Sequence, residues 1–293
     1  MIKEIFISMR PKQWYKNLII FIGIVFSLNL LNFNLWINVI SAFVVFCLLS
    51  GSIYIINDYL DIEKDINHPK KCKRPIACGS LKKSYALVFS VISIIVALLI
   101  AYSVNTPLLL ISLVFFGLQL LYSLFLKEII IVDILVISIG FVLRAVAGSL
   151  AITVSISLWL IICTFLVALF LALGKRKHEL ILLKEKASTH RKILESYSED
   201  MLDQMTNITT SVLIMSYSLY TFFTQNIYMM TTIPLAFYGI FRYMFLIHST
   251  DVGGEPEMLF KDKGMVISII IWVALVIGIL YFNKFNDIKL LSL

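Results

Sequence analysis

Long uninterrupted apolar runs constrain this chain more than any other feature. A helix rises about 1.5 Å per residue, so a run of about 20 apolar residues spans a lipid bilayer. Because lipid offers the backbone no hydrogen-bond partner, each run is expected to form a helix. The sequence therefore predicts an all-α membrane protein, a bundle of nine transmembrane helices. The runs lie near residues 18–31, 39–56, 86–102, 107–125, 130–152, 158–173, 206–223, 227–247 and 266–282.

The composition agrees with burial in lipid. The chain has 293 residues, of which 60% are hydrophobic and 15% are charged, whereas soluble domains are about half apolar. We expect a single transmembrane domain over residues 1–293. Only a few residues separate 86–102 from 107–125 and 206–223 from 227–247. Each of these two pairs is therefore predicted to form a tight helical hairpin.

The basic residues predict how the chain is oriented in the cell membrane. Of the 25 Lys and Arg residues, 21 lie in the N-terminal tail and in loops near 57–85, 126–129, 174–205 and 248–265. The positive-inside rule places these segments in the cytoplasm, and nine spans then put the C-terminus outside. Because topology accounts for the net charge of +7, we expect no nucleic-acid partner.

Acidic residues share the same loops. Of the 18 Asp and Glu residues, only Asp287 falls on the outer face, although acidic residues contribute little to orientation. Carboxylates among basic loops suggest a site for metal ions and anions, in a cavity that opens to the cytoplasmic side. Ordinary solvated loops are the alternative interpretation.

The segment from Asn57 to Asp65 carries the most informative cluster. It directly follows an apolar run, so the helix is expected to continue through it. Asn57 and Asp58 lie four and three residues before Asp61, and Asp65 lies four residues after it, so these residues would share one helical face. Mg²⁺ commonly binds one or two carboxylates together with water and phosphate oxygens. We therefore predict that Asp58 and Asp61 hold Mg²⁺ and that Asp58, Asp61 and Asp65 are catalytic; a solvated helix end is the alternative.

Basic residues follow this cluster and a further arginine lies within an apolar run. Lys73 and Arg74 suit a phosphate-bearing ligand, because Arg offers a two-pronged donor; a basic patch attracted to anionic lipid is the alternative. Arg144 is costly in lipid and is expected to face a protein interior or a cavity. It is predicted to hold the phosphate of a lipid acceptor, with a structural ion pair or carbonyl clamp as the alternative.

The pattern Asn-Asp-x-x-Asp-x-x-x-Asp from Asn57 to Asp65, followed by Lys73-Arg74-Pro75, resembles the signature of the UbiA superfamily of intramembrane prenyltransferases. That resemblance implies nine helices and an Mg²⁺-dependent pyrophosphate site. Further segments resemble one branch, the decaprenyl-phosphate phosphoribosyltransferases, from about residue 8 to about residue 265. They are Met9–Asn17, Phe141–Gly148, Gly174–Glu179, Arg191–Tyr197 and Gly253–Glu257 before Asp262.

The branch implies transfer of 5-phosphoribose from 5-phosphoribosyl diphosphate (PRPP) to a polyprenyl phosphate, a step of cell-wall biosynthesis. A homo-oligomer is one option for the assembly of such an enzyme. Asp58 and Asp61 would bind the pyrophosphate through Mg²⁺, and Asp65 would stabilise an oxocarbenium-like sugar carbon. Lys175 and Arg176 would bind the 5-phosphate, and Glu179 a ribose hydroxyl. The resemblance places the remaining substrate contacts at Lys16, Asn57, Lys73, Arg74, Tyr122, Lys127, Arg144 and Tyr197.

Two other functions are considered. A reduced second metal motif at Asp200-x-x-Asp203 would favour a prenyl diphosphate donor and an aromatic or other small acceptor. A non-enzymatic transporter or lipid-binding protein is the second alternative. Transporters often show inverted repeats and ionisable residues near the middle of the membrane, whereas the ionisable residues here gather at one predicted face.

Overall fold

The computed structural model describes residues 2–67, 71–185, 196–224, 226–249 and 262–291. The regular structure in these ranges is α-helix or 3-10 helix, and none of it is strand. The expected all-α class is therefore confirmed. The backbone divides into two compact units, Met1–Ile156 and Ser157–Leu293.

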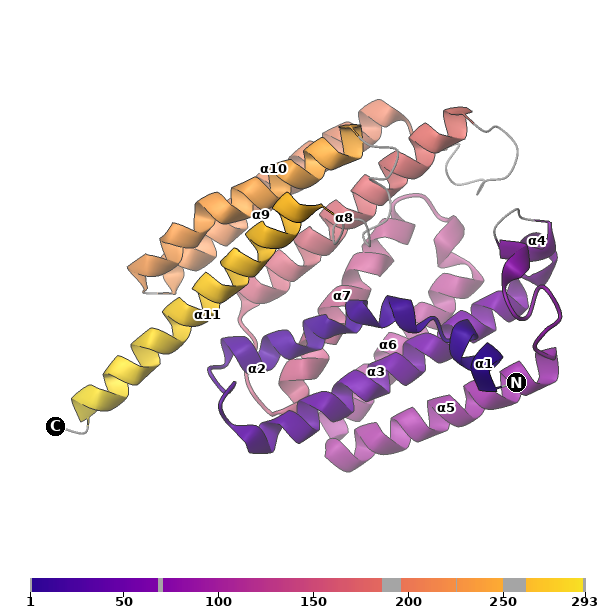
Figure 1. Ribbon diagram of the computed structural model, residues 1–293, viewed down its shortest axis with the longest axis horizontal. Coiled ribbons are helices and arrows are strands. Elements are labelled where there is room, and N and C mark those ends of the chain that lie inside the picture. The colour runs from indigo at the N-terminus through magenta and orange to yellow at the C-terminus, as the bar shows by residue number, and fades with distance from the viewer. Residues whose placement is uncertain (1, 68–70, 186–195, 225, 250–261, 292–293) are drawn as a thin grey trace. The chain divides into compact units, whose positions relative to one another are not determined.

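Helix α3 forms the centre of unit 1. It packs along α5 (Figure 1) and also against α6, α7 and the 3-10 helix η1. A helix that is apolar all round lies in a protein core or spans a membrane. The rings of Phe46 and Phe115 meet 4.7 Å apart where α3 packs on α6. The elements of unit 1 are α1 (Ile2–Ser8), η1 (Pro11–Phe21), α2 (Ile22–Phe26), α3 (Phe33–Leu60), α4 (Ile62–Ile66), η2 (Lys71–Lys73), α5 (Lys83–Val104), α6 (Thr106–Leu124), η3 (Leu126–Glu128) and α7 (Val132–Ala151).

The predicted tight hairpin between α5 and α6 is present in unit 1. Asn105 alone separates the two helices. Its side-chain oxygen accepts from the Leu108 N–H at 2.8 Å, which caps α6. Its amide nitrogen donates to the carbonyl oxygen of Leu150 at 2.9 Å and so ties the hairpin to α7.

The first apolar run, 18–31, differs from the expected straight helix. The chain there forms η1 and the short α2, and Leu28 takes a left-handed φ of 59° just beyond α2. Helix η1 lies against α7 at Gly148, where a Cβ would overlap the carbonyl oxygen of Ile20. Only glycine permits this close approach of two backbones.

Unit 2 consists of α8 (Leu158–Glu185), α9 (Glu199–Phe223), η5 (Ile227–Thr232), α10 (Ile233–Ser249) and α11 (Lys263–Leu291). Helix α9 packs against α8 and α10, and α10 packs against α11. Ser198 caps α9 by accepting from the Met201 N–H at 3.1 Å. At Gly174 a Cβ would lie 2.7 Å from the Tyr243 hydroxyl and 2.6 Å from the Ile247 side chain, so the absence of a side chain brings α8 and α10 together.

Seven helices in the described residues are long and apolar enough to cross a membrane. They cover seven of the nine expected runs. The other two are 18–31, which is divided between η1 and α2, and 206–223, which is helical in α9 but carries many Thr and Ser residues. The spans are Phe33–Leu60, Lys83–Val104, Thr106–Leu124, Val132–Ala151, Leu158–Ile181, Ile227–Ile247 and Lys263–Phe282.

Candidate active site

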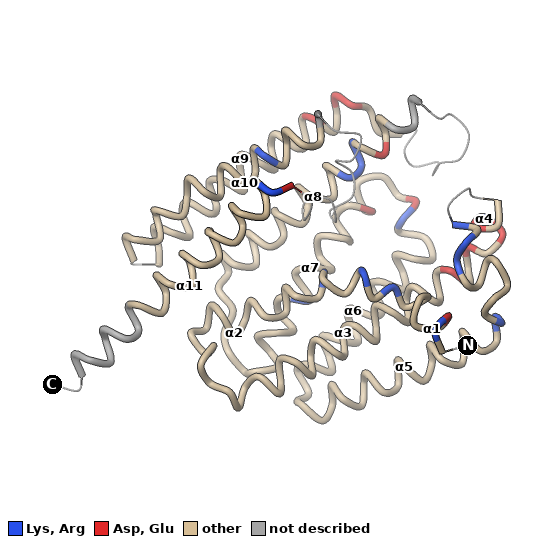
Figure 2. The backbone as a smooth tube through the Cα atoms, in the orientation of Figure 1, with Lys and Arg blue, Asp and Glu red and all other residues tan. Residues whose placement is uncertain are grey.

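Charged residues gather at particular helix ends within each unit (Figure 2). In unit 1 they lie where α3 ends and in the turn between α6 and α7. In unit 2 they lie along the last turns of α8 and at the starts of α9 and α11. The expected clustering of acidic and basic residues in the same loops is therefore visible within each unit.

The buried carboxylates of Asp58 and Asp65 are the centre of the unit 1 cluster. They are 2% and 1% exposed. Arg74 Nη1 donates to Asp58 Oδ1 at 3.0 Å and to Asp65 Oδ2 at 2.5 Å, and Arg10 donates to the same Asp58 oxygen. The side chains of Arg10 and Arg74 are 28% and 23% exposed. Buried charges need partners, and here two arginines that reach the surface neutralise two carboxylates that do not.

Asn57 and Asp61 form a second group in the same region. Lys127 of η3 donates to Asp61 Oδ2 at 3.0 Å and to Asn57 Oδ1 at 3.3 Å. The helix is interrupted at Asp61, between α3 and α4. The four residues expected on one face are thus close in space but are divided into two pairs, one on Arg74 and one on Lys127.

Arg10 is a site residue that the sequence analysis missed. It adopts a left-handed φ of 51° ahead of η1, and its guanidinium lies 4.8 Å from the centre of the Tyr54 ring. The available signal was its place in the segment Met9–Asn17, which the branch resemblance includes. Its partner Asp58 is 48 residues away, a distance at which sequence spacing gives no guide.

Arg144 is buried inside unit 1, as an arginine in an apolar helix is expected to be. Its Nε donates to Asn17 Oδ1 at 2.7 Å and its Nη1 to the carbonyl oxygen of Gly140 at 2.8 Å. The guanidinium lies 4.6 Å from the centre of the Phe115 ring. These contacts match the carbonyl-clamp alternative, and binding of a lipid phosphate by Arg144 stays a prediction.

Two ion pairs of unit 2 show the opposite burial. Arg176 and Lys177 have side chains that are 3% and 8% exposed, whereas their partners Glu179 and Asp203 are 30% and 43% exposed. Arg176 pairs with Glu179 one turn later, and Lys175 lies 3.9 Å from the same carboxylate. Lys177, which the sequence analysis did not select, pairs with Asp203 of α9.

The remaining predicted substrate contacts have defined places. Lys16 lies in η1 with its ammonium 5.9 Å from the Tyr15 ring centre, and Lys73 is exposed in η2. Tyr122 is half-buried near the end of α6, and Tyr197 is buried just before α9. Their roles stay predictions. Residues 191–195 and 253–257 of the resembling segments, and parts of the predicted loops 57–85, 174–205 and 248–265, lie outside the described residues.

The sequence model of the UbiA prenyltransferase family matches residues 18–261. The chain belongs to the UbiA prenyltransferase family. This match covers most of the chain, including the carboxylates of unit 1 and the Arg176–Glu179 and Lys177–Asp203 pairs of unit 2. The expectation of an enzyme is therefore confirmed, and the transporter alternative has no support.

Two relatives of this UbiA protein share one name, decaprenyl-phosphate phosphoribosyltransferase. It is 30% identical over 295 residues to the decaprenyl-phosphate phosphoribosyltransferase of Mycolicibacterium smegmatis, covering 94% of this chain and 92% of that protein. It is 31% identical over 285 residues to the one from Corynebacterium glutamicum, covering 94% and 86%. The resemblance to this branch, drawn from short motifs, thus extends over nearly the whole sequence.

Solved structures confirm the fold of this UbiA protein. A UbiA homolog from Archaeoglobus fulgidus bound to DMAPP and Mg²⁺ superposes with a TM-score of 0.72 at 14% identity, covering 95% of this chain and 99% of that one. A structure of the A. fulgidus homolog with GPP and Mg²⁺ gives the same score and coverage. Together with seven apolar helices of spanning length, this fold makes the chain a multi-pass membrane protein.

The carboxylates of unit 1 include a pair that suits the coordination of Mg²⁺. Among the described residues no three His, Cys, Asp or Glu side chains form a cluster able to hold a metal alone. Asp58 and Asp61 nevertheless lie three residues apart at the end of α3. Two carboxylates completed by water and phosphate oxygens are a set that Mg²⁺ ordinarily accepts. The residues therefore fit a magnesium ion that arrives with a diphosphate.

Proposed function

We propose that this protein transfers the 5-phosphoribosyl group of PRPP to a polyprenyl phosphate, giving polyprenyl-phosphoryl-5-phosphoribose and pyrophosphate. The supporting observation is the identity of 30–31% to two decaprenyl-phosphate phosphoribosyltransferases over 94% of this chain. An oxygen of the acceptor phosphate forms a bond to C1 of the ribose while the bond from C1 to the diphosphate breaks. The acceptor is already an anion, so the reaction needs no general base on the protein.

The carboxylates of unit 1 are the proposed diphosphate site. Asp58 and Asp61 would hold Mg²⁺, which supplies positive charge to the leaving pyrophosphate. Arg10, Arg74 and Lys127 already contact these carboxylates. Because guanidinium and ammonium groups also bind phosphate oxygens, they would neutralise pyrophosphate as it leaves. Asp65 would face the positive charge that develops on the sugar carbon.

The basic residues of α8 are the proposed site of the 5-phosphate. Arg176 is buried, and its partner Glu179 reaches the surface of unit 2. A buried guanidinium offers two parallel N–H groups to a phosphate more strongly than an exposed one does. Lys175 would add a second positive charge, and Glu179 would accept from a ribose hydroxyl.

The finer topology is also proposed. Nine membrane segments, formed by the seven apolar helices together with the η1–α2 segment and α9, would make one domain over residues 1–293. The N-terminus and the loops near 57–85, 126–129, 174–205 and 248–265 would be cytoplasmic, the C-terminus would be outside, and the active-site cavity would open to the cytoplasm.

Thiol labelling tests this orientation. Cys78 is exposed in the loop before α5, and hydrogen bonding with Ser80 lowers the pKa of its thiol. Since the thiolate is the reactive form, a membrane-impermeant maleimide should label Cys78 in inside-out vesicles. Labelling of Cys78 in intact cells, with Cys78→Ser as the control for specificity, would reverse the proposed orientation.

The transfer reaction is tested with membranes that contain the overproduced protein. Ribose-labelled PRPP, Mg²⁺ and decaprenyl phosphate are supplied, and label in the organic phase is counted. Label should appear with the wild type and be lost with Asp58→Ala and with EDTA. Product formed instead from a labelled prenyl diphosphate and an aromatic acceptor would replace the proposed function with prenyl transfer.

A further inference from the structure

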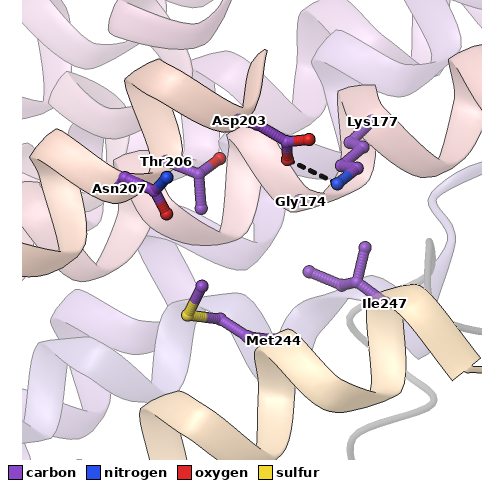
Figure 3. A pocket seen from close by; sticks show the side chains of 7 residues that line it. All are labelled: Gly174, Lys177, Asp203, Thr206, Asn207, Met244 and Ile247. Atoms are coloured by element: carbon purple, nitrogen blue, oxygen red, sulfur yellow. Dashed lines mark hydrogen bonds and ion pairs between the residues drawn. The ribbon is translucent and has the colours of Figure 1, made fainter. Parts of the chain in front are cut away.

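A small pocket in unit 2 has two chemically different walls. Its volume is about 240 Å³. One side is formed by the Lys177–Asp203 ion pair together with Thr206 and Asn207, and the opposite side by Met244 and Ile247 of α10 (Figure 3). Gly174 completes the lining at the close contact of α8 with α10.

The polar wall is rich in hydrogen-bonding groups and carries little net charge. The positive charge of Lys177 is neutralised by Asp203. A phosphate would therefore meet the carboxylate of Asp203, and a metal ion would meet the ammonium of Lys177. Asn207 adds a neutral amide one turn after Asp203, which can donate and accept. This wall suits neutral hydroxyl groups better than either kind of ion.

The apolar wall and the volume restrict the ligand further. Met244 and Ile247 offer a surface that can pack against the C–H groups of a ring. Pockets for drug-sized ligands have volumes of about 300–1,000 Å³, so a cavity of about 240 Å³ is suited to one small ring. A long isoprenyl chain would leave the polar wall without hydrogen-bond partners, at a cost in affinity.

We propose that this pocket binds a pentose ring, with Asp203 and Asn207 hydrogen-bonded to ring hydroxyls and Met244 and Ile247 packed against the opposite ring face. The proposal rests on the proposed function, because it identifies the pentose as the ribose of the phosphoribosyl donor. It makes Lys177 a positioning residue that holds Asp203, and Asp203 and Asn207 specificity residues. A prenyl diphosphate has no hydroxyls for this wall.

The test measures binding to the purified full-length protein in detergent with Mg²⁺. Labelled PRPP is displaced by ribose 5-phosphate or by arabinose 5-phosphate, which differ only in the configuration of one hydroxyl. Asn207→Leu and Asp203→Asn are compared with the wild type, and Gln204→Ala, exposed on the same helix, is the control. Inorganic pyrophosphate is titrated as a ligand that lacks the sugar.

The wild type should bind ribose 5-phosphate more tightly than arabinose 5-phosphate. Asn207→Leu should weaken PRPP binding by about tenfold, the scale of one lost hydrogen-bond partner, and should abolish the preference between the two sugars. The affinity for pyrophosphate should not change. Gln204→Ala should behave as the wild type in all three measurements.

Two results would overturn the assignment of the pocket while leaving the proposed function intact. In one, Asn207→Leu and Asp203→Asn keep both the wild-type affinity for PRPP and the sugar preference. In the other, PRPP and pyrophosphate binding weaken equally, which indicates a general structural role. A wild-type protein that binds pyrophosphate but neither binds PRPP nor transfers phosphoribose would overturn the proposed function, and the pocket assignment with it.

Discussion

The two charged clusters are built in opposite ways. In unit 1 the carboxylates of Asp58 and Asp65 are buried, and the arginines that neutralise them reach the surface. In unit 2 the cations Arg176 and Lys177 are buried, and their acidic partners reach the surface. These ion pairs therefore keep one sign of charge fixed in the interior and the other sign where a ligand can replace it. The Lys127–Asp61 pair of unit 1, with side chains that are 12% and 21% exposed, does not share this pattern.

This difference assigns a different ligand chemistry to each cluster. A buried carboxylate that loses its surface arginine needs another cation, which Mg²⁺ can supply. A buried guanidinium that loses its surface carboxylate needs another anion, which phosphate can supply. We therefore expect ligand exchange, with metal replacing arginine in unit 1 and phosphate replacing carboxylate in unit 2.

Replacement of the central carboxylate of unit 1 should have the largest effect. Asp58→Asn keeps the size of the side chain but removes the negative charge that two arginines share. Phosphoribosyl transfer should fall by about 100- to 1,000-fold, as when one preorganised electrostatic group is removed from an active site. Initial rates at saturating Mg²⁺ measure this loss. A variant that regains wild-type rates at high Mg²⁺ would show that Asp58 is not needed for the chemical step.

Replacement of the buried Arg176 of unit 2 should have the next largest effect on the reaction. Arg176→Met should raise the KM for PRPP by about 10- to 100-fold, which corresponds to about 1.5–3 kcal/mol for a hydrogen bond to a charged group. Glu179→Gln removes the surface partner and leaves Arg176 available to phosphate, so its KM should change less. Steady-state kinetics measure the KM for PRPP of both variants. A larger rise in KM for Glu179→Gln than for Arg176→Met would mean that Glu179, and not Arg176, is the main contact of the donor.

Removal of the surface residue Arg10 from unit 1 should have a smaller effect, and it should reduce the requirement for Mg²⁺. Arg10 and a metal ion compete for Asp58, so Arg10→Met should lower the Mg²⁺ concentration for half-maximal activity. The shift should be about two- to fivefold, the range for a partly exposed ion pair. Arg10→Lys keeps the charge and should stay near the wild type in the same Mg²⁺ titration. A raised Mg²⁺ requirement in Arg10→Met would exclude competition.

The sequence was informative where the physical signal is local. Apolar length identified the seven helices of spanning length, and the Asn105 cap lies at the short gap that predicted the α5–α6 hairpin. The structure of the run 18–31 was harder to predict, because Ile20 in this run packs against Gly148 of α7, which is distant in the sequence. The number of apolar residues also could not separate α9 from the seven helices of spanning length, because its Thr and Ser residues lower its hydropathy without preventing a helix.

Long-range pairing could not be predicted from the sequence. The interval of three or four residues correctly brought Asp58, Asp61 and Asp65 near one another, but the interruption at Asp61 divides them between Arg74 and Lys127. Arg10 and Lys177 were missed because their partners are 48 and 26 residues away. Arg144 was correctly expected to be buried, yet nothing in its own helix indicates the distant Asn17.

A third ion pair, Arg242–Asp262 of unit 2, has side chains that are 34% and 17% exposed. It gives the smallest expected effect and the baseline for the two clusters. Asp262 accepts from Arg242 Nε at 3.1 Å and Nη2 at 2.8 Å, and from the Met265 N–H at 2.7 Å at the start of α11. These bonds, the Arg242 bonds foremost, hold the pKa of Asp262 below its usual range. The pair should therefore stabilise the fold above about pH 4, the usual pKa of a free Asp, and this contribution should be lost as pH falls through the lower folded value.

Asp262→Asn retains an oxygen for the helix cap but removes the charge. Its melting temperature at pH 7 should lie up to about 3 °C below that of the wild type, and the gap should close on acidification because the wild type loses the same charge. Thermal unfolding of the purified protein between pH 7 and pH 3 measures this gap. Glu128→Gln, in a 3.8 Å pair with Lys64 that is more than half exposed, should show no gap at any pH. A gap for Asp262→Asn as large as the melting-temperature gap measured in the same way for Asp58→Asn would mean that burial does not separate the clusters. The contrast between the two units would then need another cause.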